Sequence, residues 1–509
     1  GGTVINGVSA ELLLSPGMIV AGENLTLNGG YLSSQSGVGS SWSGNISITT
    51  NSTISTSGSL EVSGVISSTG TYGLTKSGSN TLTLSNANTY TGTTTISAGT
   101  LKVGNPAALG PSSGAGAVSI TAGAVLDLNG QSLTNSGTLT IRGTGISSGG
   151  ALINSSSTPA SYSALVALGA ASSIVGDTGT IALTNVGTIT GATFGLTLGG
   201  AQGGSIASII GTTSGTVTKE GAGTWLLSGA NTYTGITTIN GGVLSVTTLA
   251  NGASASSIGQ STNVASNLVI NGGTLQFVGS TNQSTDRWFT IGANGATLDA
   301  SGTGVLTWAG NGAGGTNKIA FSSTTITPTL TLTGSGFGIL TTILSDAGTG
   351  SYKSSLIKSG TGTWRLNGSN SYTGDTNINT GILQAGNANS FASGTSLVKV
   401  NLNGTLDLYG VTVSKSFTLN GGVLTNSNTS TAGGIGWSNG ITLLADSKLT
   451  AATGATLNIG VPNNGSGKIT GAFAITIGDA NNRGTVSFTN STPHDYSGGT
   501  VVDYGVLQL

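Results

Sequence analysis

The chain of 509 residues contains no cysteine, one histidine and few charged residues. The lack of cysteine excludes disulfides, thiol nucleophiles and thiolate metal sites. Charged residues make up 6% of the chain, against roughly 25% in ordinary soluble domains. The formal net charge is −1 and the sequence has no basic patch, so we expect no nucleic-acid partner.

Long apolar runs are also lacking. The most apolar early segment, at 11–14, is far shorter than the roughly 20 residues that span a bilayer, so we predict no membrane span in this chain. The charged and apolar regions of a signal peptide are not recognisable either. If the protein is exported, we expect these residues to be a mature or excised piece.

The abundant features are glycine, with 89 residues, and short apolar clusters. Because the clusters have the size of strands and recur regularly, we reject disorder. Three stretches align without a gap, and a more divergent fourth copy follows. They read KSGSNTLTLSNANTYTGTTTISAGTLKV at 76–103, KEGAGTWLLSGANTYTGITTINGGVLSV at 219–246, KSGTGTWRLNGSNSYTGDTNINTGILQA at 358–385 and RGTVSFTNSTPHDYSGGTVVDYGVLQL at 483–509.

Each copy predicts three short strands separated by turns. Leu82 and Leu84 share one face of the first strand, and Leu101 and Val103 share one face of the last. Such a unit of about 25 residues cannot close a core alone, but stacked units bury a continuous one. The repeats therefore predict an all-β fold, a parallel β-helix with three short strands per coil. No linker interrupts it, so we predict a single continuous domain over 1–509.

The copies, most clearly GTWLLSGANTYTGITTINGGVLSV, resemble the passenger-associated β-strand repeat of bacterial autotransporters. The resemblance implies a right-handed parallel β-helix, secretion and a place at the cell surface of a bacterium. It does not imply an enzyme. A complete autotransporter also has a signal peptide and a C-terminal translocator barrel, neither of which is recognisable here.

The recurring tyrosines mark equivalent corners of the coils. We interpret them as corner packing, with exposed platforms for sugar stacking as the alternative. Trp225 and Trp364 fill the slot of Leu82, which also indicates packing, and the three recurring lysines are interpreted as solvated charges at turns. The repeat markers are Tyr90, Tyr233, Tyr372 and Tyr496, and the lysines are Lys76, Lys219 and Lys358.

Motifs that carry chemistry are weak in this sequence. His494 with Ser497 and Asp503 suggests a catalytic triad, but neighbours in one turn rarely adopt that geometry, and we favour a polar turn. The stretch 465–468 resembles a phosphate loop but lacks the required Ser or Thr. Carboxylates and arginines are scattered, so we predict no enzyme, no catalytic residue and no cofactor.

Three aspartates recur in Leu-Asp contexts, namely Asp127, Asp299 and Asp407. We favour turn capping for them and keep calcium binding as the alternative. The glycine-rich calcium nonapeptide is not matched, so no metal site is predicted.

The two ends of the sequence both read as parts of a repeat, and neither shows a cap. We therefore predict end-to-end stacking of copies of this chain. The residues expected at the junction are Gly2, Thr3, Val4 and Ile5 at one end, and Val501, Val502, Val506, Leu507 and Leu509 at the other.

The leading functional prediction is a structural extracellular protein, a β-solenoid rod that forms or belongs to a surface fibre or coat. The alternative is an autotransporter-type adhesin passenger, in which irregular coils at 145–215 or 311–350 bind a host or a surface polysaccharide. A polysaccharide-degrading β-helix enzyme is the third possibility.

Overall fold

A computed structural model describes residues 2–135, 137–310, 319–391, 396–435, 440–460, 468–489 and 493–509. The chain divides into two compact units, residues 1–245 with 253–261, and residues 246–252 with 262–509. The single continuous domain over 1–509 stays a prediction. The phosphate-loop-like stretch at 465–468 lies outside the described residues except for Lys468.

Unit 1 is a stack of parallel strands in which each strand pairs with its equivalent one turn later. In the first repeat, β11 (Leu74–Ser77) pairs with β13 (Thr94–Ile96), and β12 (Thr81–Leu84) pairs with β14 (Thr100–Val103). Leu82 of one turn lies opposite Leu101 of the next. This register, with equivalent residues stacked, defines a β-solenoid and confirms the predicted fold class.

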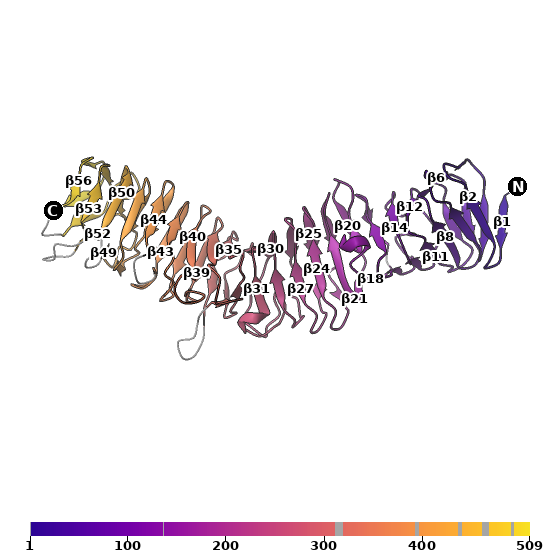
Figure 1. Ribbon diagram of the computed structural model, residues 1–509, viewed down its shortest axis with the longest axis horizontal. Coiled ribbons are helices and arrows are strands. Elements are labelled where there is room, and N and C mark those ends of the chain that lie inside the picture. The colour runs from indigo at the N-terminus through magenta and orange to yellow at the C-terminus, as the bar shows by residue number, and fades with distance from the viewer. Residues whose placement is uncertain are drawn as a thin grey trace. The chain divides into compact units, whose positions relative to one another are not determined.

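The remaining strands of unit 1 follow in chain order, and Figure 1 shows them as successive rungs. They are β1 (Thr3–Asn6), β2 (Glu11–Leu14), β3 (Ile19–Val20), β4 (Leu25–Asn28), β5 (Tyr31–Ser34), β6 (Ser40–Trp42), β7 (Ile46–Ile48), β8 (Ser52–Thr56), β9 (Leu60–Val62), β10 (Ile66–Ser68), β15 (Val118–Ile120), β16 (Val125–Asp127), β17 (Ser132–Leu133), β18 (Leu139–Gly143), β19 (Leu152–Ile153), β20 (Ala160–Tyr162), β21 (Val166–Val175), β22 (Ile181–Leu183), β23 (Thr188–Ile189), β24 (Leu196–Gly199), β25 (Gly203–Ile206), β26 (Ile209–Ile210), β27 (Val217–Lys219), β28 (Thr224–Leu227) and β29 (Thr237–Ile239), with β30 (Val243–Val246) at the boundary.

Unit 2 has the same architecture, again with parallel pairs between successive turns. Its strands are β31 (Leu268–Ile270), β32 (Thr274–Phe277), β33 (Gln283–Thr285), β34 (Thr290–Ile291), β35 (Ala296–Ala300), β36 (Leu306–Trp308), β37 (Ala320–Phe321), β38 (Thr329–Thr333), β39 (Phe337–Leu340), β40 (Ser355–Lys358), β41 (Thr363–Leu366), β42 (Thr376–Ile378), β43 (Gly381–Ala385), β44 (Val398–Asn401), β45 (Gly404–Asp407), β46 (Thr412–Val413), β47 (Phe417–Asn420), β48 (Val423–Asn426), β49 (Gly433–Ile435), β50 (Ile441–Ala445), β51 (Ser447–Ala451), β52 (Thr456–Ile459), β53 (Ile469–Gly471), β54 (Ile475–Ile477), β55 (Thr485–Phe488), β56 (Asp495–Tyr496), β57 (Thr500–Val502) and β58 (Val506–Gln508).

The core of each unit is a column of inward-facing aliphatic side chains. In β12 the threonines face outward while Leu82 and Leu84 are fully buried, as the alternation of the sequence predicts. Trp225 and Trp364 occupy the equivalent buried slot in the next two copies. Their indole N–H groups donate to backbone carbonyls at 2.9 Å and 2.7 Å, which satisfies the polar atom of each buried ring.

Two segments that the sequence marks as irregular still contain strands. Residues 145–215 carry loops, as expected, yet strands continue through them, including the ten-residue β21. In the Thr-rich stretch at 324–333, β38 begins at Thr329, directly after Pro328. Proline cannot donate to a ladder, and Pro328 contributes only its carbonyl, which accepts from Ser355 at 3.0 Å.

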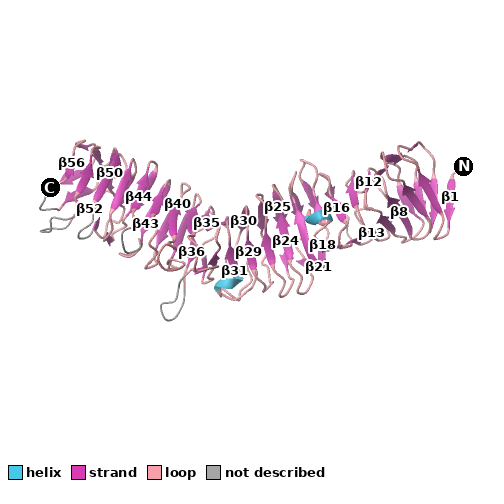
Figure 2. Cartoon of the chain, in the orientation of Figure 1, coloured by secondary structure: helices cyan, strands magenta, loops and turns pink. Residues whose placement is uncertain are grey.

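Helices in the part of the chain that the structure describes are two short 3-10 turns, η1 (Ile146–Ser148) and η2 (Ala265–Asn267), coloured cyan in Figure 2. None of the helices in the described residues has the length and apolar character needed to cross a membrane.

Candidate functional site

The recurring lysine of the repeat is buried, so its interpretation as a solvated charge is wrong. Lys76 lies on β11 with the same inward orientation as Leu74. Its Nζ donates to the carbonyls of Ser77 and Gly78, each at 2.8 Å. A third hydrogen bond, of 2.9 Å, reaches the Ala98 carbonyl in the next coil. All three donors of the ammonium group are therefore used to join two coils.

The same arrangement recurs in the other two complete copies. Lys219 donates to Glu220, Gly221 and Gly241, and Lys358 donates to Ser359, Gly360 and Thr380. Burial lowers the pKa of Lys76, Lys219 and Lys358 to about 8 in each case.

A glycine makes room for each amine. Gly99 has a φ of +64°, and a Cβ added there would lie 2.8 Å from Lys76 Nζ and 2.5 Å from two carbonyl oxygens. No other residue fits this backbone and this space without displacing the lysine. The glycine at this corner is thus part of the lysine site.

An asparagine two residues before each tyrosine acts as a piece of backbone. Asn88 Oδ1 accepts the N–H of Ile66 in the preceding coil at 2.7 Å, and its Nδ2 donates to the Ala108 carbonyl in the following coil at 2.7 Å. One buried side chain thereby joins three coils where the third strand of the turn is missing. From the sequence, this asparagine is recognisable only as a turn residue, because its two partners lie in the neighbouring coils.

The asparagine contacts are the same in the other complete copies. Asn231 joins Ile210 and Ser257, and Asn370 joins Leu344 and Ser390.

Corner packing was predicted for all four recurring tyrosines, and three of them are buried in this way. Tyr90 is fully buried, and its hydroxyl shares a hydrogen bond of 2.7 Å with Thr94 Oγ1. Burial raises the pKa of Tyr90 to about 12. Tyr233 with Thr237 and Tyr372 with Thr376 repeat this contact. Buried and hydrogen-bonded rings are not platforms for a sugar, so the stacking alternative is wrong for these three.

The fourth copy keeps only part of this arrangement. Tyr496 contacts Thr500 through its hydroxyl, but it is only half-buried. His494 stands in the asparagine position, and its Nδ1 accepts the Ile469 N–H at 3.1 Å, as the asparagine Oδ1 does elsewhere. The ring packs edge-on against Phe488, with centroids 4.5 Å apart.

His494 therefore takes over the acceptor role that the asparagine has in the other copies. Among the described residues, no hydrogen bond joins it to Ser497 or Asp503. The polar-turn interpretation fits this geometry, and the catalytic triad does not.

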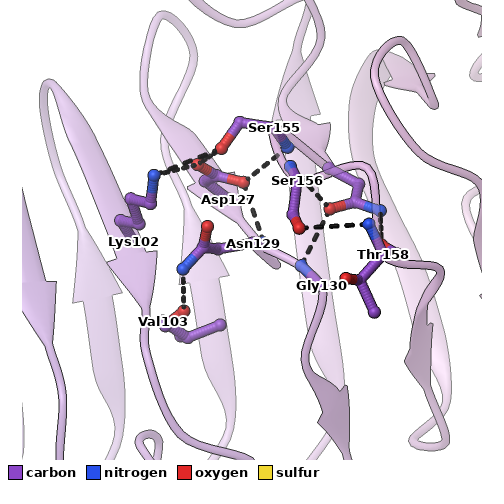
Figure 3. Close-up of polar contacts among 9 residues, drawn as sticks. Lys102, Val103, Asp127, Asn129, Gly130, Ser155, Ser156 and Thr158 are labelled. Atoms are coloured by element: carbon purple, nitrogen blue, oxygen red, sulfur yellow. Dashed lines mark hydrogen bonds and ion pairs between the residues drawn. The ribbon is translucent and has the colours of Figure 1, made fainter.

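A separate polar corner surrounds Asp127 at the end of β16, and Figure 3 shows it. Asp127 Oδ1 accepts the backbone N–H groups of Asn129 at 2.9 Å and Ser155 at 3.0 Å. Its Oδ2 accepts the Ser155 hydroxyl at 2.6 Å. Lys102 approaches the same carboxylate at 3.9 Å. Asp127 thus caps its own turn and ties it to the next coil, as the predicted capping requires.

Unit 2 contains the same corner at Asp407. Its Oδ1 accepts from the N–H groups of Tyr409 and Ser427, each at 3.0 Å, and its Oδ2 accepts from the Ser427 hydroxyl at 2.5 Å. Asp299 instead bonds side chains, Ser301 at 2.5 Å and Gln276 at 3.1 Å. In the described part of the chain, no three His, Asp or Glu side chains gather as a metal site.

A groove of about 570 Å³ opens beside the Asp127 corner, entirely within unit 1. Its lining includes Ser155 from the corner, Asp177 and Glu220 from later turns and Ser148 from η1. Most of the lining lies in the segment 145–215, where the sequence predicted irregular coils, and the rest, at 220–222, belongs to the second repeat. Sequence reasoning did not identify its residues, because they come from four successive turns.

The residues predicted for end-to-end stacking lie on terminal strands of the two units. Val4 on β1 and Val501, Val502 and Val506 on β57 and β58 are each more than half exposed. Either a further coil of a longer chain or another copy would cover them. The stacking therefore stays a prediction.

The fold and these corners define a class of protein, a parallel β-solenoid whose recurring polar residues hold its own coils together. Four stretches match the passenger-associated-transport-repeat, at 74–103, 217–246, 356–385 and 483–509. The chain thus carries four of these repeats, which confirms the resemblance, and the Lys, Asn and Tyr sites lie inside the first three.

A longer protein shares further sequence with the chain. It is described as "Adhesin BmaC autotransporter", from Brucella suis biovar 1 (strain 1330), and is 37% identical over 246 residues. The match covers 48% of this chain and 6% of that adhesin, so the chain corresponds to a small part of it. The comparison with solved structures gave no match.

Proposed function

We propose that this chain is a segment of an adhesin-type autotransporter passenger, secreted or displayed at the surface of a bacterium. The observation that supports it best is the 37% identity with an autotransporter adhesin, together with the four passenger-associated repeats. The adhesin alternative from the sequence thereby gains support over the fibre.

The geometry supports separate roles for the buried and the exposed residues of this passenger segment. The recurring Lys, Asn and Tyr side chains are buried and occupied by the protein's own groups, so they stabilise the solenoid. A ligand must then contact the outward faces and loops that differ from turn to turn. We infer a binding protein and not an enzyme.

Two measurements test this proposal. Antibodies against the purified chain should label intact bacteria, and protease treatment of whole cells should abolish the labelling. The purified chain should also bind host cells, matrix or polysaccharide saturably. Exclusive labelling of permeabilised cells would contradict the surface location, and the lack of any saturable ligand would contradict the adhesin role.

Fibre formation by axial stacking is a second proposal. The exposed valines on β1, β57 and β58 support it, because apolar strand edges pair readily with other strands. Sedimentation at rising concentration tests it: association that Val501→Lys abolishes would support stacking, and a monomer at high concentration would refute it.

A further inference from the structure

We propose that the groove beside the Asp127 corner binds an uncharged oligosaccharide, a proposal that rests on the adhesin-type function. The groove crosses four successive turns of unit 1. At about 4.8 Å between strands, these turns provide about 14 Å of continuous surface. An extended chain of hydroxylated rings laid along the stack matches such a site.

An unsatisfied hydroxyl in the groove lining points to a missing partner. Ser173 on β21 is 4% exposed, lines the groove, and its Oγ has no hydrogen-bond partner among the described residues. The adjacent Ser172 shows the contrast, since its Oγ lies within hydrogen-bond distance of two carbonyl acceptors, those of Ile141 at 3.0 Å and Ala170 at 2.8 Å. Buried polar groups are nearly always paired in folded proteins, so Ser173 Oγ is a position where a ligand hydroxyl would be satisfied.

Another part of the groove lining has an uncommon backbone conformation. Ser147 and Ser148 in η1 have φ values of +50° and +61°, a region that residues other than glycine rarely adopt. Outliers of this kind concentrate at binding sites, where the surrounding structure holds them. Ser148 presents its side of the groove from this segment.

The charges of the lining select the class of ligand. Asp177 and Glu220 line the groove, and none of its lining residues is a lysine or arginine. Asp177 Oδ1 accepts the N–H of Ala201 at 3.2 Å, which leaves Oδ2 free among the described groups. Free carboxylate oxygens repel sulfated or uronic sugars and accept strong hydrogen bonds from neutral hydroxyls.

Hydroxyl side chains complete the lining. Thr197, on the outward face of β24, can both donate and accept within the groove. Ser155 can only accept there, because its hydroxyl hydrogen is donated to Asp127. The lining combines carboxylates with hydroxyls. A basic peptide would use only the carboxylates, whereas a neutral glycan can form hydrogen bonds with both kinds of group, so we favour the glycan. A site built to hydrogen-bond hydroxyls also discriminates against ligands that lack them.

The test uses the full 509-residue chain on an array of neutral, acidic and sulfated glycans, with a Lys-rich peptide as a further probe. Titration calorimetry then compares the best neutral glycan with three variants, Ser173→Ala, Asp177→Asn and Glu220→Gln. The matched control is Glu61→Gln, which removes a carboxylate of unit 1 outside the groove. We expect each groove variant to weaken binding at least tenfold and the control to leave it unchanged.

Ser173→Ala separates a loss of binding from a loss of folding, because the hydroxyl that it removes makes no hydrogen bond among the described residues of the unbound protein. Its unfolding midpoint should equal that of the parent chain. Binding only of acidic glycans or of the peptide would overturn the proposal. Neutral-glycan binding that survives all three variants would overturn the groove but leave the adhesin function standing, whereas a chain that binds no ligand at all would count against both.

Discussion

The third and fourth copies of the repeat, both in unit 2, fill the same corner with different side chains. In the third copy, Asn370 accepts the Leu344 N–H at 2.9 Å and donates to the Ser390 carbonyl at 2.6 Å. In the fourth, His494 accepts the Ile469 N–H at 3.1 Å, and its Nε2 has no partner among the described residues.

This difference separates two tasks that the asparagine combines. Accepting the N–H of the preceding coil is retained when the residue changes, so that bond is the one the turn requires. Donating to the following coil is retained only in the complete copies. A side chain in this position thus replaces the backbone hydrogen bonds of one strand residue. An amide can both accept from the preceding coil and donate to the following one.

The lysine distinguishes the two copies most strongly, because the fourth has no equivalent of Lys358. Lys358→Met would leave three carbonyl groups at the corner without their donor. We expect a local loss of about 2–4 kcal/mol in stability. Hydrogen exchange of the backbone amides of β42 and β43 measures it.

The matched control for this substitution is Lys448→Met. Lys448 is exposed on β51 of the same unit, so its replacement should change stability by less than about 0.5 kcal/mol. Equal protection in the two variants would show that the buried ammonium does not hold the coils.

Replacing the asparagine tests whether acceptance and donation are separable. Asn370→Ala leaves the N–H of Leu344 and the carbonyl of Ser390 unpaired, and we expect a loss of about 2–3 kcal/mol. Asn370→His keeps an acceptor, as in the fourth copy, so Leu344 should stay protected from exchange while Ser390 loses its donor. If the histidine variant exposes Leu344 as much as the alanine variant does, the equivalence between Asn370 and His494 is wrong.

Acid should weaken the fourth copy selectively. Burial, and then the nearby Lys468, hold the pKa of His494 below its usual range. The neutral ring is the form that accepts from Ile469, so this contribution is present above the unfolded pKa, about 6.5, and is lost as the pH falls through the lower folded pKa. The amide of Ile469 should therefore lose exchange protection, corrected for intrinsic rates, in acid.

His494→Asn supplies the comparison, because an amide does not titrate in this range. In that variant the protection of Ile469 should be independent of pH between 7 and 4. A parent chain that is equally insensitive would show that the histidine nitrogen does not carry the bond.

Much of the fold could be predicted from the sequence because stacked turns repeat the same inward residues. The alternation around Leu82 predicted which face of the strand is buried. The replacement of this leucine by Trp225 in the second copy indicated a position in the core, and both side chains are buried there. The Tyr90 corner followed from the same logic. The lysine interpretation failed because a charged residue is rarely buried, and its acceptors come from two different turns.

A signal for the lysine was nevertheless present. Lys76 has the same alternation as Leu74, so it must face inward, and Gly99 recurs at the position that admits the amine. The groove offered no comparable signal. Its residues belong to four turns of unequal length, and only the folded register brings Asp177 and Glu220 to one surface.

The smallest expected difference between the copies concerns the tyrosine hydroxyl. Tyr372 is 1% exposed and shares a hydrogen bond of 2.5 Å with Thr376, so Tyr372→Phe leaves a buried threonine hydroxyl unpaired. We expect a loss of about 1 kcal/mol. The same substitution at Tyr496 should have almost no effect, because water can replace the lost partner of the exposed Thr500. Denaturant unfolding of the two variants against the parent chain measures the difference, and equal losses would mean that the hydroxyl at this corner contributes through something other than its burial.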